Sequence, residues 1–209
     1  MGVMASGIIS GLTAVFTVTL TIWLYQRRDK LNALRAVKAE AKQNKHTAET
    51  IHEHITEDIQ LREDGRERMT SIQPLSNSSY QNIKNSGILT QLPEDTRKTI
   101  SKHYSRISFA NHQLEYRQQM RSTSRALSNL SAMLEIIDQV ILKEMILMGA
   151  VDLTVTSEAV DNPDFEEAFD KITTFDDVIK SVDNELNNHP ILTKIICTCL
   201  APVDFATVS

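Results

Sequence analysis

Two residues in the first half of the chain have the spacing of a metal enzyme. Glu49 and His52 form a Glu-x-x-His pair, and residues three apart share one face of a helix. Di-iron bundle enzymes place two such pairs opposite each other. Neither His103 nor His112 has a glutamate three positions earlier. We therefore expect a solvated polar face, with no catalytic residue, metal ligand or cofactor. A metal-dependent helical-bundle enzyme that uses Glu49 and His52 is the alternative.

The two cysteines of the chain, Cys197 and Cys199, are one residue apart. They provide no disulfide framework, which suits a reducing compartment. A structural zinc site needs four ligands, and only His189 lies nearby as a further candidate. We interpret the cysteines as buried small apolar residues. The sequence also contains no glycine-rich phosphate loop and no G-x-S-x-G motif, so we predict no enzymatic activity.

Five basic side chains close together in the sequence are candidates for contact with anionic lipid: Arg27, Arg28, Lys30, Arg35 and Lys38. Near a membrane each such charge contributes about 1 kcal/mol at most. The alternative is that these residues only set the topology and solvate one helix face.

Charge is divided unevenly along the chain. Residues 27–125 contain 18 Lys and Arg against 12 Asp and Glu, whereas residues 126–209 contain 4 against 15. The basic part therefore lies next to the N-terminal segment and the acidic part is distal. No aromatic platform is interleaved with the basic residues, so we expect no nucleic acid partner.

An uncharged segment at residues 2–26 precedes the basic residues. As a helix, residues 3–25 reach about 34 Å, enough to cross a hydrocarbon core of about 30 Å. Trp23 and Tyr25 lie at its end, where amphipathic rings favour the lipid–water boundary. No basic residue precedes the segment, which is unlike a cleaved signal peptide. The positive-inside rule then predicts a single-pass protein with its N-terminus outside and its C-terminal region in the cytoplasm.

Gly7 and Gly11 form a G-x-x-x-G pattern within this segment. Small residues at this spacing let two membrane helices approach closely. The pattern permits a homo-oligomer through these two glycines, although glycine is also tolerated in helices that face lipid. Membrane lipid, a second copy or a protein partner are the partners we expect.

Two long helices are predicted from apolar periodicity. Residues 26–64 continue the first segment, and residues 94–148 form the second helix. A kink or break is predicted at residues 121–125, the poorest helix-forming part of the second helix. The connector at 65–93 should fold the second helix back. We therefore expect an antiparallel pair in which one apolar set, Leu34, Ala41, Ala48 and Ile55, faces another, Ile100, Ile107 and Leu114.

The connector carries its own local signals. Pro74 ends any helix before it. Ser76 or Asn77 can cap a short helix that runs to about Asn85. Gly87 suits the left-handed conformation after its end.

The acidic C-terminal part has weaker patterns. Short helices are predicted at 164–169 and 175–187. Residues 134–148 are strongly apolar on one face. They either rest at the lipid interface or pack against the juxtamembrane segment 27–40, or, if the chain breaks near residues 122–124, form a core with residues 165–186. Residues 191–203 are apolar but too short to span a bilayer.

Several capping and packing residues of this chain resemble those of a widespread group of uncharacterised prokaryotic single-pass membrane proteins. The resemblance covers roughly residues 1–115 and implies an N-terminal anchor, a basic juxtamembrane helix and a helical hairpin, with no known activity. It rests on Leu31, Leu34, Glu40, Asn44, Pro74, Leu75, Ser76, Tyr80, Ser86, Gly87, Ile88, Leu89, Leu92, Pro93, Glu94, Tyr104, Ile107 and Asn111.

Together these patterns predict an all-α protein with a transmembrane anchor at 1–26. A basic helical hairpin or small bundle at 27–125 follows, and then an acidic region with short helices at 126–209. The function expected is that of a membrane-anchored scaffold or interaction protein. A membrane-perturbing or phage-type accessory protein is a further alternative.

Overall fold

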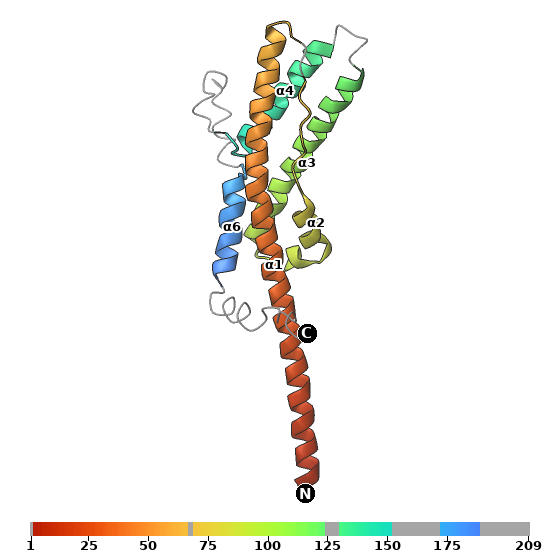
Figure 1. The fold of residues 1–209 in the computed structure, drawn as a ribbon. Coiled ribbons are helices and arrows are strands. Elements are labelled where there is room, and N and C mark those ends of the chain that lie inside the picture. The colour runs from red at the N-terminus through yellow and green to blue at the C-terminus, as the bar shows by residue number, and fades with distance from the viewer. Residues whose placement is uncertain (1, 67–68, 124–129, 152–171, 189–209) are drawn as a thin grey trace, which may run out of the picture.

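The structure is a computed structural model of the chain. It describes residues 2–66, 69–123, 130–151 and 172–188. The all-α prediction is confirmed, because these residues form α-helices and a single 3-10 turn and contain no strand. One long helix extends from a small helical bundle (Figure 1).

The long helix, α1, comprises Gly2–Glu63. Sixty-two residues at about 1.5 Å each give a rod of roughly 93 Å. Its first part projects beyond the bundle, and the side chains of residues 13–23 are all exposed. The bundle covers α1 from Leu31, the first buried apolar residue. The helix ends before Gly65, whose φ of 74° is left-handed.

The chain then returns along α1 in an extended conformation. Thr70 lies beside Asp58 near the end of α1, and Ser76 lies beside Asn44 half-way down. The return is completed by a short helix, α2 (Ser78–Asn85), and a 3-10 turn, η1 (Ile88–Gln91).

The expected short helix of the connector is thus confirmed. Asn77 occupies the N-cap position, but its side chain makes no capping hydrogen bond. Gly87 has the left-handed conformation predicted for it, with φ of 73°.

The next helix, α3 (Glu94–Thr123), runs in the same direction as α1. Its Tyr104 bonds to Glu40 of α1, and its Arg117 bonds to Asp58 further along both helices. The antiparallel hairpin expected for residues 27–125 is therefore wrong. The reason is the extended return: nine residues at 69–77 cover roughly 30 Å at about 3.3 Å each, so α3 starts at the lower end of the bundle.

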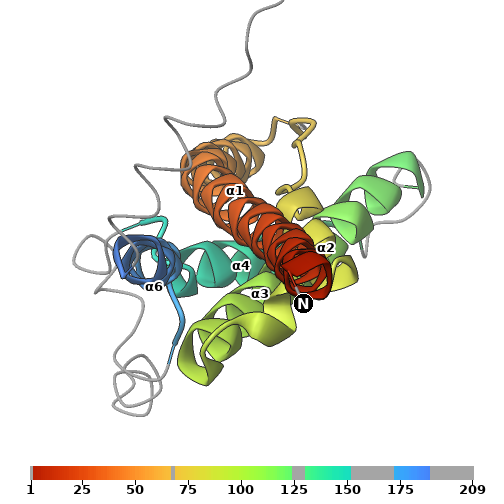
Figure 2. The same ribbon diagram turned by 90° about the horizontal axis from the view of Figure 1, so that it is seen from below.

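The apolar residues named for that hairpin are nevertheless all buried. They face a shared core rather than a two-helix seam, because α2, α4 and α6 also pack on α1. Figure 2 shows α1 crossing the other helices when the bundle is viewed from below.

The hairpin of this protein is formed instead by α3 and α4 (Leu130–Leu147), which run in opposite directions. The break expected at 121–125 agrees with the end of α3 at Thr123. Residues 124–129 lie outside the described part.

The last described helix, α6 (Phe175–Asn187), has the predicted bounds and lies antiparallel to α1. Its capping box is formed by Thr174 and Asp177. Phe175 and Val178 join Met145 and Met148 of the α4 region in one core. Residues 134–148 thus pack into the bundle, and the core predicted for them is confirmed with α6, while residues 165–171 lie outside the described part.

Some expectations fall outside the described residues. These are the helix at 164–169, the apolar stretch at 191–203, and the two cysteines Cys197 and Cys199. No helix in the described part combines the length and apolar character that crossing a membrane requires. The spanning role of residues 2–26 stays a prediction, and Gly7 and Gly11 lie among the first twelve residues, whose side-chain surroundings are not described.

Ala48 provides a test of how tightly α1 is packed. It has no exposed surface, whereas Ala39 on the same helix is exposed. We expect Ala48→Phe to lower the free energy of unfolding by about 1–3 kcal/mol, because the core has no room for a ring. Ala39→Phe should leave it within about 0.5 kcal/mol of the parent. Chemical unfolding of the full chain in detergent measures both, and equal stabilities would contradict this packing.

Candidate functional site

A buried carboxylate on α1 gathers donors from three parts of the chain. Glu40 is 6% exposed. Its Oε2 accepts hydrogen bonds from the hydroxyls of Ser76 (2.8 Å) and Ser78 (2.9 Å) and from the backbone N–H of Ser79 (2.9 Å). Its Oε1 accepts from the Tyr104 hydroxyl at 2.8 Å. We call these five residues the Glu40 cluster.

The ionised form of Glu40 is favoured in this cluster. Burial is the largest single influence and raises its pKa, but the four donated hydrogen bonds together outweigh burial and lower the pKa. The pKa of Tyr104 is raised by burial and by the Glu40 charge, so its hydroxyl stays a neutral donor. The Tyr80 ring stacks on Tyr104 with centroids 4.6 Å apart. The carboxylate therefore acts as an acceptor that ties the connector and α3 to α1.

Two asparagines hold the connector backbone on either side. Asn44 of α1 donates to the carbonyl of Ser76 at 2.7 Å and accepts from its N–H at 2.8 Å. Asn111 of α3 makes the same pair of bonds with Leu75, both at 2.8 Å. An amide side chain offers one donor side and one acceptor side, so it pairs with an extended backbone as a neighbouring strand would. Both asparagines are among the residues on which the predicted resemblance to single-pass membrane proteins rests.

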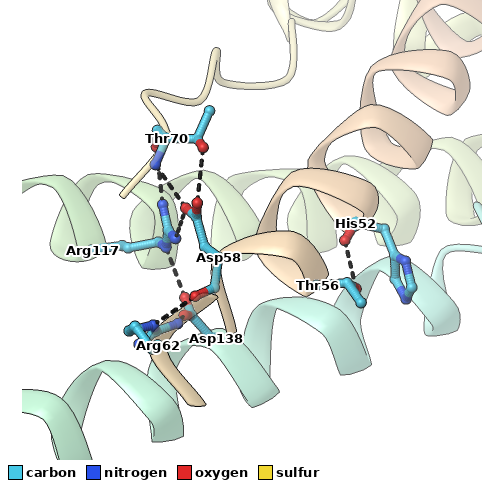
Figure 3. A network of polar contacts seen from close by, with 7 residues as sticks. All are labelled: His52, Thr56, Asp58, Arg62, Thr70, Arg117 and Asp138. Atoms are coloured by element: carbon cyan, nitrogen blue, oxygen red, sulfur yellow. Dashed lines mark hydrogen bonds and ion pairs between the residues drawn. The ribbon is translucent and has the colours of Figure 1, made fainter. Parts of the chain in front are cut away.

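A second polar centre lies further along α1, near the end of that helix (Figure 3). Arg117 is 1% exposed. Its guanidinium donates to Asp138 of α4 (2.7 Å), to Asp58 of α1 (2.8 Å) and to the carbonyl of Thr70 (3.1 Å). Arg62 also donates to Asp138. We call these five residues the Arg117 cluster.

The charges of the Arg117 cluster balance, since two arginines face two aspartates. Asp58 also accepts from the N–H and the hydroxyl of Thr70, at 2.7 and 2.9 Å. Burial raises the pKa of Asp58, but the bonds from Arg117 and Thr70 outweigh it and lower the pKa. Breaking such a buried set by removing one partner strongly destabilises a protein, because a charge is left unpaired.

The geometry of both clusters indicates anchoring rather than catalysis. Their carboxylates are buried, and their oxygens are engaged by fixed donors from the protein. A general acid or base needs access to a substrate proton, which neither arrangement offers. The clusters fasten α1, the connector, α3 and α4 into one unit.

The residues considered for a metal site do not come together in this way. On the helix surface, Oε2 of Glu49 lies 3.6 Å from Nδ1 of His46. His52 is half-buried, with its pKa lowered mainly by burial, and Figure 3 shows it turned away from the Arg117 cluster. Among the described side chains, no group of three His, Cys, Asp or Glu could hold a metal ion.

The two histidines of α3 have different surroundings. His103 is fully buried, its ring lies 4.6 Å from that of Phe175, and its Nδ1 is 3.4 Å from the Thr173 carbonyl. Burial is the main cause that lowers its pKa to about 4. His112 is exposed. His103 is thus a core residue that joins α3 to α6.

The basic residues after the first segment meet acidic side chains of α6. Lys30 pairs with Glu185 at 2.8 Å, and Lys38 pairs with Asp183. Of the other three candidates for lipid contact, Arg27 lies over the Trp23 ring with its Cζ 5.2 Å from the centroid, Arg28 is half-buried and Arg35 is exposed.

The residues of the Arg117 cluster were not identified from the sequence as a site. A signal was present, because Asp58 falls three residues after Ile55 on the apolar face of α1, and Arg117 three after Leu114 on that of α3. A charge at such a position indicates a buried partner. The partner itself is 59 residues away and cannot be read from periodicity.

Comparison with known proteins finds no matching family model, no matching curated protein and no matching solved structure. The resemblance to single-pass membrane proteins therefore stays a prediction.

Removing Arg117 should have a large effect on stability. Arg117→Met keeps much of the side-chain volume but leaves Asp58 buried without its guanidinium. We expect the free energy of unfolding to fall by about 3–5 kcal/mol. The exposed Lys42 of α1 provides the control, and Lys42→Met should change the free energy of unfolding by less than about 0.5 kcal/mol. Chemical unfolding measures both variants. A loss of stability of similar size in the two would refute the role of the cluster.

Glu40 should make stability depend on pH. Its folded pKa is lowered, so its contribution is complete above the unfolded pKa of about 4.5 and is lost as the pH falls through the folded pKa. Glu40→Gln should destabilise the protein at pH 7, and the difference from the parent should narrow below about pH 4.5. Unfolding midpoints from pH 7 to 3 test this, with exposed Glu53→Gln as the control. A difference that stays constant with pH would contradict the prediction.

Proposed function

We propose that this protein is a membrane-anchored helical scaffold, in which α1 is both the anchor and the central rod of a bundle that meets a partner. The single observation that carries the proposal is the exposed apolar surface of α1 before the bundle begins. Seven large side chains there are between 43% and 68% exposed: Val15, Phe16, Val18, Leu20, Ile22, Trp23 and Tyr25. So long an apolar surface is unstable in water and stable in lipid.

The threonines of this surface support the same interpretation. The hydroxyls of Thr17, Thr19 and Thr21 each donate to the carbonyl four residues earlier at 2.8 Å. Lipid supplies no hydrogen-bond partners, so a polar side chain on a spanning helix must be satisfied within the protein. Here each hydroxyl finds its acceptor on its own helix.

The bundle suits a scaffold because it is fastened to the anchor without a joint. The helix α1 is continuous from Gly2 to Glu63, and the Glu40 and Arg117 clusters bind the connector, α3 and α4 to it. A rod of this kind fixes the distance and orientation of the bundle relative to the membrane.

The outer face of α3 supplies a surface for a protein partner. Phe109 and Tyr116 are 45% and 43% exposed and lie seven residues apart, so they share one helix face with the exposed His112 between them. Aromatic side chains are enriched where proteins bind one another. In the proposed orientation this face belongs to the cytoplasmic part.

Charges placed in the exposed apolar surface test the anchoring. Val18→Arg combined with Leu20→Arg should abolish membrane integration, because each arginine near the middle of a spanning helix costs about 2.5–3.5 kcal/mol. The parent chain should resist alkaline extraction from membranes and the double variant should not. Gln43→Arg, on the exposed face of α1 within the bundle, is the control and should behave as the parent. Extraction of the parent chain would refute the anchor.

A reporter enzyme that works only outside the membrane tests the orientation. The reporter should be inactive when it is fused after Ser209. The basic residues Arg27, Arg28 and Lys30 are expected to keep the chain that follows the apolar segment in the cytoplasm. Activity of the fusion would overturn the orientation while leaving the anchor in place.

A further inference from the structure

A small cavity lies where α1 leaves the bundle. It is lined by Arg27, Lys30, Leu31 and Leu34 of α1 and by Glu185 near the end of α6, and its volume is about 40 Å³. That is room for on the order of three water molecules, and the cavity is partly open to the surface. The uncharged segment ends at Gln26, one residue before the cavity. If α1 spans the membrane as proposed above, the cavity lies at the level of the lipid head groups.

Arg27 lines this cavity and carries a donor without a described partner. Its Nε is buried and finds no hydrogen-bond acceptor among the described residues. A buried donor left unsatisfied is costly. The guanidinium is held in place by Trp23, whose ring centroid is 5.2 Å from Cζ, a cation–π distance. The Trp23 ring thus holds the guanidinium at the cavity, and its Nε has no acceptor among the described residues.

The charges of the lining favour one negative charge. Arg27 and Lys30 are positive and Glu185 is negative, which leaves one positive charge in excess. Lys30 Nζ uses a donor on Glu185 Oε1 at 2.8 Å, but an ammonium has three. A monoanion with several acceptor oxygens would balance the charge and satisfy both cations.

We propose that this cavity binds the phosphodiester group of a phospholipid. The proposal rests on the membrane anchoring proposed above. Guanidinium groups match phosphate oxygens in geometry and charge, and the phosphodiester carries a single negative charge. The position of Trp23, at the end of the apolar segment, places the site where head groups lie. A bound head group would join α1 to the end of α6 and fix the lower end of the bundle on the membrane.

Arg28 provides a matched control for Arg27. It is the next residue, carries the same charge and is half-buried, but it does not line the cavity. General attraction between basic residues and anionic lipid acts on both arginines alike. If the cavity is a specific site, replacing Arg27 weakens lipid binding and replacing Arg28 does not.

The experiment uses the full chain purified in detergent. A short-chain phosphatidylglycerol is titrated, and bound lipid is counted by native mass spectrometry. The parent should retain one molecule per chain. Arg27→Gln should weaken its binding about tenfold, the loss of one charge-assisted hydrogen bond, whereas Arg28→Gln should change it less than about twofold. Equal weakening in both variants would show general attraction only and overturn the site.

The Glu185→Gln variant distinguishes a change at the site from a loss of folded protein. It removes the negative charge from the lining and frees Lys30 for the ligand. We expect binding of phosphatidylglycerol to tighten about fivefold, because the carboxylate no longer repels the phosphate and Lys30 is free to donate to it. A damaged fold would weaken binding instead. Unchanged or weaker binding in a variant that retains the helical circular dichroism of the parent would overturn the assignment of this cavity.

Two further ligands identify the source of the phosphate. Diacylglycerol, which lacks the phosphodiester, should not compete for the site. Inorganic phosphate at millimolar concentration should displace little phosphatidylglycerol, because it lacks the acyl chains that hold the head group at the boundary. Displacement by inorganic phosphate as effective as that by the phospholipid would assign the site to a free anion and overturn the lipid proposal.

Flotation of the parent and of Arg27→Gln with phosphatidylglycerol vesicles separates this inference from the anchor. Both should float, because the apolar segment is unchanged. A parent that fails to float would refute the anchoring itself. A parent that floats but retains no phospholipid selectively in the titration would overturn the cavity proposal alone.

Discussion

Residues 70–77 run as an extended chain between helices and lead into the first turn of α2, and no described strand lies beside them to take their backbone hydrogen bonds. Buried backbone groups must be paired, and here side chains of α1 and α3 supply the partners. Asp58 and Arg117 bind Thr70, Gln118 binds Ile72, Asn111 binds Leu75, Asn44 binds Ser76 and Glu40 binds Ser79. Both polar clusters therefore supply hydrogen-bond partners to the backbone of this segment.

The direction of the other helices depends on that segment. Because the chain returns along α1 before α3 begins, α3 runs parallel to α1, and α4 must then fold back on α3. Asp138 of α4 completes the Arg117 cluster, so the charges that join α1 to α3 also hold α4. The lower half is fastened differently: α6 lies on α1 through apolar residues of the core and through Lys30 and Lys38.

The two ends of the bundle thus have different chemistry. At the far end, the charges of the Arg117 cluster are matched within the protein and enclosed. At the end nearest the exposed part of α1, Arg27 retains a buried donor without a described acceptor, beside a small cavity. Charges that are paired within the protein stabilise the bundle, whereas the excess positive charge beside the cavity is the basis of the proposed ligand site. This contrast connects the proposed scaffold to the proposed contact with lipid.

Local signals in the sequence determined the all-α class, the positive φ of Gly87, the end of α3 near Thr123 and the bounds of α6 at 175–187, because caps, glycines and apolar periodicity act over a few residues. The buried apolar residues of α1 followed from the same periodicity. The direction of α3 and the polar clusters could not be predicted in this way. Asp58 and Arg117 are 59 residues apart, and a charge on an apolar face indicates only that some partner exists. Only the tertiary structure selects the partner, since that choice depends on which buried backbone and charged groups remain to be satisfied once the helices have packed.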